Sequence, residues 1–116
     1  MAAREPSALA HKVTDLISML GLTHEEIGGI VEASARSVSR WSSGEVVPQR
    51  LNKQRLVELA YVAEAVAHVL PRDQANLWMF TPNRLLDHDT PADRIRAGRY
   101  KDVLDLIEAI ADGVVV

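Results

Sequence analysis

The sequence predicts an all-α protein, and three observations support that prediction. Apolar residues recur three or four positions apart through most of the chain, which is the period at which one face of a helix meets a core. Glycine, proline and short polar residues separate these segments, and such residues begin and end helices. No segment shows the polar–apolar alternation of a half-buried strand, and only the final Val114, Val115 and Val116 have a strand-like composition.

The first three helices are marked by both spacing and caps. Gly21 follows the first as a helix-ending glycine would. Thr23 and Glu26 have the spacing of a capping box that starts the second helix. Ser34 is expected to cap the third, and Gly44 lies beyond its end. The apolar residues that define the first helix are Leu9, Val13, Leu16 and Leu20.

A long fourth helix is predicted after Pro48. The run 51–70 is rich in apolar residues and stops at Pro71, which cannot continue a helix. Its apolar residues spread around more of the helix than one core-facing stripe requires. Two interpretations follow, a central core helix or a contact between two copies of the chain.

Short helices are predicted after Pro71. Asp73 is expected to cap the segment "QANLWMF". Two Thr-Pro pairs each place a cap residue before a proline at the first helical position, namely Thr81-Pro82 and Thr90-Pro91. The expected ends of the last two helices are Gly98 and Gly113.

Composition narrows the class of protein. The 116 residues include no cysteine, which excludes disulfides and thiolate zinc sites. The N-terminus has no apolar signal-peptide core, and no run approaches the length of a membrane span, so a cytoplasmic protein is expected. The four histidines are far apart in sequence, and no nucleophile–base pair, phosphate loop or paired carboxylates stand out. We therefore predict a protein that is not an enzyme and needs no metal or cofactor.

Charge is distributed unevenly along the chain. The net charge of the whole sequence is −3, but the window 34–55 carries five bases against the single acid Glu45, which gives +4. A local basic patch in an acidic protein indicates a site for nucleic acid, although an ordinary solvated helix face is the alternative. The bases in this window are Arg36, Arg40, Arg50, Lys53 and Arg55.

The second and third predicted helices, joined by a tight turn at Ala33-Ser34, have the layout of a helix-turn-helix. Val38 and Trp41 would face inward. Gly28 is expected to let the two helices pack closely. Arginine can bind a phosphate or a guanine with two hydrogen bonds, and short serines let a helix approach DNA. The predicted DNA-binding residues are Arg36, Ser37, Ser39, Arg40, Arg50 and Lys53. Arg50 and Lys53 are expected to contact phosphates, and Arg55 is expected to join them in this role.

Two segments together resemble a known family. The segment "GLTHEEIGGIVEASARSVSRWSSGEVVPQRLNKQRLVEL" resembles the Xre-type helix-turn-helix, and "DQANLWMFTPNRLLDHDTPADRIRAG" resembles the toxin-binding domain of MbcA/ParS/Xre-type antitoxins. The resemblance implies two parts, a helix-turn-helix domain with its long connecting helix at 1–70 and a toxin-binding domain at 71–116. It also implies a partner, a cognate RES-domain toxin that destroys NAD, together with dimerisation and repression of the antitoxin's own operon.

The C-terminal part contains the expected toxin contacts. A mixed-charge cluster beside Tyr100 suits recognition of an enzyme surface, although a solvated face is the alternative. The resemblance implies that the C-terminus lies at the mouth of the toxin's active site and obstructs substrate. The predicted toxin-binding residues are Arg94, Gly98, Arg99, Tyr100, Lys101, Gly113, Val114, Val115 and Val116.

Other functions stay open on the sequence alone. The chain could be a stand-alone transcriptional regulator whose C-terminal domain only dimerises, or a structural adaptor without DNA binding. The apolar concentration in "NLWMFTPNRLL" fits either a partner surface or the core of the C-terminal part.

Overall fold

A computed structural model describes residues 8–113, and these residues form seven α-helices and one 3-10 turn with no strand among them. The all-α prediction is therefore confirmed. No helix within 8–113 has both the length and the apolar character needed to cross a membrane. The elements are α1 (Ala8–Leu20), α2 (His24–Val31), α3 (Ala35–Ser42), α4 (Arg50–Ala67), α5 (Arg72–Met79), η1 (Arg84–Leu86), α6 (Pro91–Arg96) and α7 (Tyr100–Ala111).

Local capping signals set most helix boundaries. The Thr23 hydroxyl accepts from the Glu26 amide at 3.0 Å, and the Glu26 carboxylate accepts from the Thr23 amide at 3.0 Å. Ser34 caps α3 by accepting from the Ser37 amide. Thr90 caps α6 in a second capping box. These caps confirm the predicted helix starts. The predicted helix ends are confirmed by glycines with positive φ, namely Gly21 at +64°, Gly98 at +83° and Gly113 at +90°.

Two predicted caps are wrong, both around α5. The helix begins one residue before Asp73, with Pro71 at its N-cap, so Asp73 lies in the first turn. No helix begins at Pro82, because the Thr81 hydroxyl donates back to the Leu77 carbonyl at 2.6 Å and stays with the end of α5. The next element is the 3-10 turn η1, and the Asn83 side chain caps it by accepting from the Leu85 amide.

The turn between α2 and α3 depends on two unusual positions. A Cβ at Gly28 would lie 2.4 Å from the Ala33 carbonyl oxygen, so only glycine fits. Glycine is therefore required by the turn that follows α2, and not by the face of the third helix as the sequence suggested. Glu32 adopts the left-handed conformation, with φ +61°, that a glycine usually supplies in such turns.

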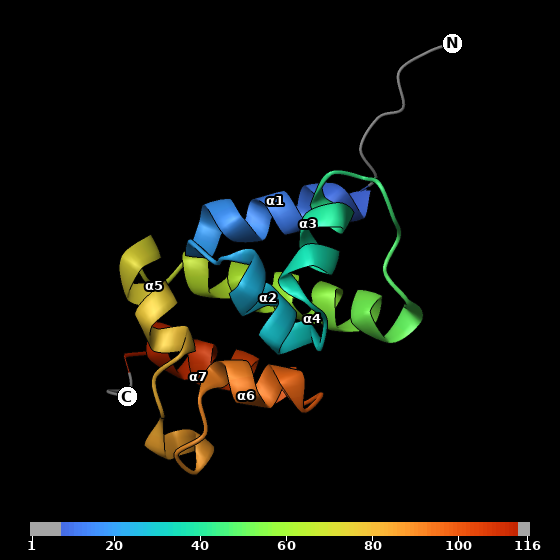
Figure 1. Ribbon diagram of the computed structural model, residues 1–116. Coiled ribbons are helices and arrows are strands. Elements are labelled where there is room, and N and C mark those ends of the chain that lie inside the picture. The colour runs from blue at the N-terminus through green and yellow to red at the C-terminus, as the bar shows by residue number, and fades with distance from the viewer. Residues whose placement is uncertain (1–7, 114–116) are drawn as a thin grey trace.

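The core is continuous from α1 to α7, and α4 lies at its centre. In Figure 1, α4 runs between α1 above and α6 and α7 below, and it packs against all three. Its buried residues include Leu56, Leu59, Val62, Ala63 and Val66, which supports the interpretation as a central core helix. The same cluster contains Val13 from α1 and Ile107 from α7. The segments on the two sides of the predicted boundary at 70/71 therefore share one core.

Two side chains, one amide and one guanidinium, form hydrogen bonds between the N-terminal and C-terminal halves of the chain. The Asn76 side chain of α5 donates to the Leu20 carbonyl at the end of α1, at 2.8 Å. Arg55 of α4 donates to the Arg96 carbonyl at the end of α6, at 3.3 Å. These bonds satisfy carbonyls that a helix end leaves without an intrahelical partner.

Candidate partner-binding surfaces

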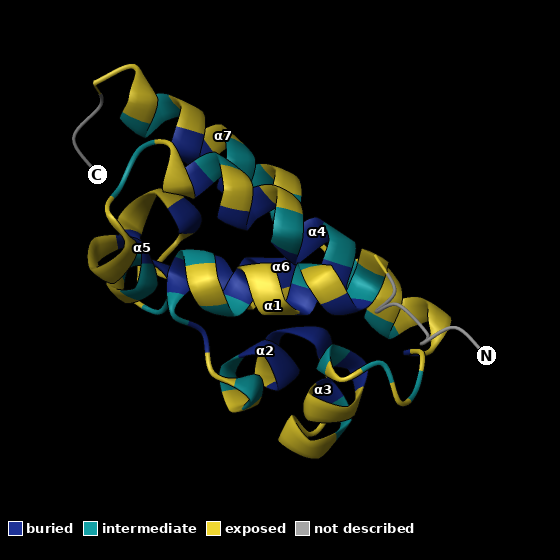
Figure 2. Cartoon of the chain, turned by 90° about the horizontal axis from the view of Figure 1, so that it is seen from above, coloured by how far each residue is buried: buried dark blue, intermediate teal, exposed yellow. Residues whose placement is uncertain are grey.

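The outer face of α3 is polar and accessible, as Figure 2 shows by its exposed positions. Val38 and Trp41 are buried beneath it, as the helix-turn-helix layout predicted. Arg36 and Ser39 are exposed, while the predicted contact Ser37 is half-buried beside the cap of the helix. Arg40 is exposed and lies 3.4 Å from the Glu45 carboxylate. An ion pair this exposed is weak, so Arg40 can exchange Glu45 for another anion.

Arg50 and Lys53 lie on a different surface from the α3 face. Both are exposed on α4 and line a groove of about 330 Å³ together with Tyr61 and Tyr100. No α3 residue lines this groove, because α3 packs against α1 and α2. Their role as DNA phosphate contacts stays a prediction.

Arg55, predicted to contact phosphate, has internal partners in this structure. Its guanidinium is largely covered, forms an ion pair with Glu58 at 2.9 Å, and donates to the carbonyl of Arg96. It also lies over Gly98, where a Cβ would come within 2.9 Å of one guanidinium nitrogen. Arg55 is therefore an internal link between α4 and the α6–α7 turn. The φ of +83° at Gly98 favours glycine at this position, whereas the Arg55 guanidinium is the end of a flexible side chain and can shift.

Arg94 is buried, with 7% of its surface exposed, so it is not an accessible contact residue in this structure. Nε donates to Asp89 at 2.8 Å, Nη1 to Asp102 at 2.8 Å, and Nη2 to the Leu86 carbonyl at 2.7 Å. The hydrogen bond to Asp89 raises the pKa of Arg94 above its ordinary value, so this cation stays charged. It fixes the loop before α6 to the first turn of α7. The sequence could not show this, because the residue type alone does not distinguish an internal from an external arginine.

The other charged residues predicted at this turn are accessible. Arg99 is exposed and its Nε lies 2.9 Å from the Asp102 carboxylate, which Arg94 also contacts. Lys101 is exposed, and Tyr100 is half-buried in the groove that it lines with Arg50 and Lys53, which we call the α4–α7 groove. Gly98 is exposed at the same turn, so the structure brings four of the predicted toxin-binding residues together there.

Gly113 is exposed directly after α7 and is the last described residue. The predicted contacts Val114, Val115 and Val116 lie outside the described residues.

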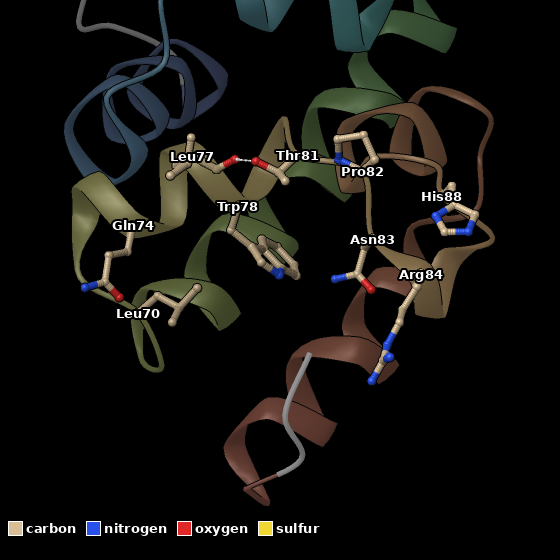
Figure 3. Close-up of a pocket in the computed structure, with 9 residues that line it drawn as sticks. All are labelled: Leu70, Gln74, Leu77, Trp78, Thr81, Pro82, Asn83, Arg84 and His88. Atoms are coloured by element: carbon tan, nitrogen blue, oxygen red, sulfur yellow. Dashed lines mark hydrogen bonds between the residues drawn. The ribbon is translucent and has the colours of Figure 1, made fainter.

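A groove that the sequence analysis did not predict lies between α5 and η1 (Figure 3). We call it the α5–η1 groove; its volume is about 580 Å³ and its walls are mainly apolar. The sequence signal for this groove is the apolar segment "NLWMFTPNRLL", whose residues divide between core and surface. Met79 and Leu86 are buried, but Leu77 is 71% exposed and Leu85 is 53% exposed. The residues that shape the groove include Leu70, Leu77, Trp78, Pro82, Arg84 and His88.

No group of three or more histidine, aspartate or glutamate side chains within residues 8–113 could hold a metal ion. The surfaces described above are a polar helix face, an exposed charged turn and an apolar groove.

Comparison with known proteins gives the class of protein first. Residues 63–113 match the family described as the antitoxin Xre/MbcA/ParS C-terminal toxin-binding domain. This match begins within α4 and covers the α5–η1 groove and the α6–α7 turn.

Full-length relatives then give the family. The mycobacterial cidal antitoxins MbcA of Mycobacterium tuberculosis and Mycobacterium bovis are 66% identical to this chain over 110 residues, covering 95% of this chain and 97% of the relative. A probable mycobacterial cidal antitoxin of M. tuberculosis, Rv3188, is 29% identical over 107 residues. A chain in the crystal structure of the M. tuberculosis MbcT–MbcA toxin–antitoxin complex aligns with a TM-score of 0.86 and 65% identity, covering 95% of this chain and 99% of that one. The chain therefore belongs to the MbcA antitoxin family.

Proposed function

We propose that this chain is the antitoxin of a type II toxin–antitoxin pair and neutralises a RES-domain toxin that degrades NAD. One observation carries the proposal: the chain is similar along nearly its whole length to an antitoxin, MbcA, that has been crystallised with its toxin, MbcT. Because the likeness covers 95% of this chain and 97% of that relative, it includes most of both halves of the molecule.

The proposed mechanism is occlusion and requires no chemistry from the antitoxin. Arg99, Tyr100 and Lys101 supply a charged contact surface on the exposed turn. Val114–Val116 would enter the toxin's nucleotide cleft, as the sequence analysis predicted. An apolar segment gains free energy when such a cleft covers it, and the toxin loses access to its substrate.

Repression of its own operon is the second part of the proposal. The exposed Arg36, Ser39 and Arg40 on the outer face of α3 support it, because a helix-turn-helix reads DNA with that face. We place the pair in the cytoplasm, where both operator DNA and NAD are found.

An alternative function is a stand-alone transcriptional regulator, which the same α3 face would serve. Co-expression with the product of the adjacent gene, followed by co-purification and mass measurement, separates the two. An antitoxin is expected to co-purify with a RES-domain protein in a complex of fixed mass. A regulator that purifies alone and leaves the toxin free would contradict the proposal.

The same mass measurement addresses self-association. We propose a homodimer or a larger hetero-oligomer with toxin. The α4–α7 groove, which Val57, Tyr61 and Tyr100 line, is the proposed contact. Sedimentation of the free antitoxin as a monomer at high micromolar concentration would reject a constitutive dimer.

A further inference from the structure

The loop around η1, residues 83–89, is fixed by hydrogen bonds of its own main chain. The Asn83 amide donates to the Asp89 carbonyl at 3.0 Å, which closes the loop, and the Asn83 carbonyl accepts from the His88 amide at 2.9 Å. Asp87 and His88 are both left-handed, with φ +55° and +69°, a conformation that costs free energy in residues other than glycine. The loop therefore keeps one conformation against local strain.

Arg94 holds the η1 loop from the inside. This buried guanidinium donates from Nη2 to the Leu86 carbonyl at 2.7 Å and from Nε to the Asp89 carboxylate at 2.8 Å. Its Nη1 donates to Asp102, in the first turn of α7, at 2.8 Å. One side chain thus fixes the loop to α7. A loop that is fixed before it meets a partner loses little conformational freedom on binding.

The η1 loop presents a leucine to solvent beside an apolar part of α7. Leu85 is 53% exposed, although its neighbour Leu86 is 3% exposed. Leu85 and Leu86 line a depression of about 370 Å³ together with Leu106 and Ala109 of α7, and we call it the η1–α7 depression. An isolated exposed leucine needs no explanation, whereas a rigidly held leucine beside an apolar depression is typical of the centre of an interface.

The charges around the η1–α7 depression indicate the kind of surface that it fits. Arg94 and Arg99 line it, and both already pair with Asp102. Asp105 also lines it and is exposed, and its carboxylate has no ion pair or side-chain hydrogen bond within residues 8–113. An apolar side chain beside a lysine or arginine therefore matches this surface.

The η1–α7 depression is continuous with the toxin contacts of the proposed function, because Arg99 belongs to both. The toxin of that proposal degrades NAD, so its substrate site must accommodate a pyrophosphate. Arginine and lysine are the side chains that bind such groups. The mouth of a site of this kind can supply the cation that Asp105 lacks among the described residues.

We propose that the η1–α7 depression receives an apolar side chain of the toxin and that Asp105 pairs with a neighbouring lysine or arginine of the toxin. Leu85 supplies the apolar contact, and Arg94 is the positioning residue that holds Leu85 in place. This inference rests on the proposed function, because the partner is the same toxin.

Binding of the full chain to immobilised, purified cognate toxin tests the apolar contact. Leu85→Ala is expected to raise Kd about five- to tenfold, as loss of a partly buried leucine side chain implies. Leu51→Ala on α4 is the matched control, because Leu51 is 54% exposed and lies outside the depression, and its Kd should equal that of wild type. Equal Kd for all three proteins would overturn the inference and leave the proposed function standing. A wild-type chain that does not bind the toxin would overturn both.

The same assay tests the charge contact. Asp105→Asn is expected to raise Kd about two- to fivefold at low salt and less at high salt, because an exposed ion pair is screened. Glu108→Gln is the control, since Glu108 is exposed on the same helix but does not line the depression. The same Kd for Asp105→Asn and wild type at low salt would contradict the pairing.

A double-mutant cycle tests the positioning role of Arg94. Arg94→Lys keeps the charge but loses the guanidinium fork, so it is expected to weaken toxin binding on its own. In the Leu85→Ala background it should have a smaller effect, because the contact that it positions is already gone. Each variant is measured well below its own Tm, so that all are folded. The same loss in both backgrounds would show that Arg94 does not act through Leu85.

Discussion

Gly28 and Gly29 are adjacent in α2 but have opposite surroundings. A Cβ at Gly28 would meet the Ala33 carbonyl at 2.4 Å, whereas a Cβ at Gly29 would meet nothing within 4 Å. We expect Gly28→Ala to lower the free energy of unfolding by about 1–3 kcal/mol, because the backbone of the turn must move. Gly29→Ala should raise it by up to about 1 kcal/mol, since alanine is the better helix former.

Urea unfolding of the two variants beside wild type measures both effects. Gly29→Ala serves as the control for the general effect of adding a methyl group to α2. Equal changes in the two variants would show that the turn carbonyl does not require glycine at position 28.

Arg94 is the residue on which the C-terminal loop depends. Its guanidinium fork contacts Asp89, Asp102 and the Leu86 carbonyl, and a lysine ammonium cannot reach all three. We expect Arg94→Ala to lower Tm by several degrees and Arg94→Lys to lower it less. Because the pKa of Arg94 is raised, its contribution to stability is fully present at neutral pH and is lost only at strongly alkaline pH, as pH rises through that raised pKa.

Arg99→Ala is the matched control for Arg94, because Arg99 shares Asp102 but is exposed. Its Tm should stay near that of wild type. An Arg94→Ala variant as stable as Arg99→Ala would show that the buried network contributes nothing to the fold.

Among the elements, α3 carries the DNA-binding prediction. Arg40→Ala is expected to weaken operator binding by roughly 1–3 kcal/mol if Arg40 reads a base, and the salt slope should fall by about one unit for each phosphate that the variant no longer neutralises. Gel-shift assays at two salt concentrations measure this. Arg99→Ala, an exposed arginine on the opposite half of the chain, is the control. Unchanged affinity in an Arg36/Arg40 double alanine variant would reject α3 as the reading helix.

The elements also show how far sequence reasoning reaches. Thr23 and Glu26 predicted a boundary correctly because a capping box needs only residues three apart. Arg55 could not be assigned in this way, since its partner carbonyl at Arg96 is 41 residues away. Leu77 and Met79 are two positions apart with opposite exposure, which only the packing of α5 decides. Helix existence and caps are local information, whereas the groove and the internal arginines depend on tertiary contacts.

For the whole molecule, one continuous core implies that the C-terminal surfaces are held on a rigid support. Deleting Val114–Val116 removes no described core residue, so Tm should be unchanged. Neutralisation of the toxin should be weakened, because the segment proposed to occupy the cleft is gone. Equal inhibition by full-length and truncated antitoxin would place the blocking contacts on the α6–α7 turn, around Arg99 and Lys101.

The central claim is that this chain inhibits a toxin by binding it. The most direct test is to follow NAD consumption by the purified cognate toxin while full-length antitoxin is added. The account predicts that NAD consumption falls in proportion to added antitoxin and stops once the toxin is saturated. Undiminished NAD consumption in the presence of a large excess of folded antitoxin would contradict it.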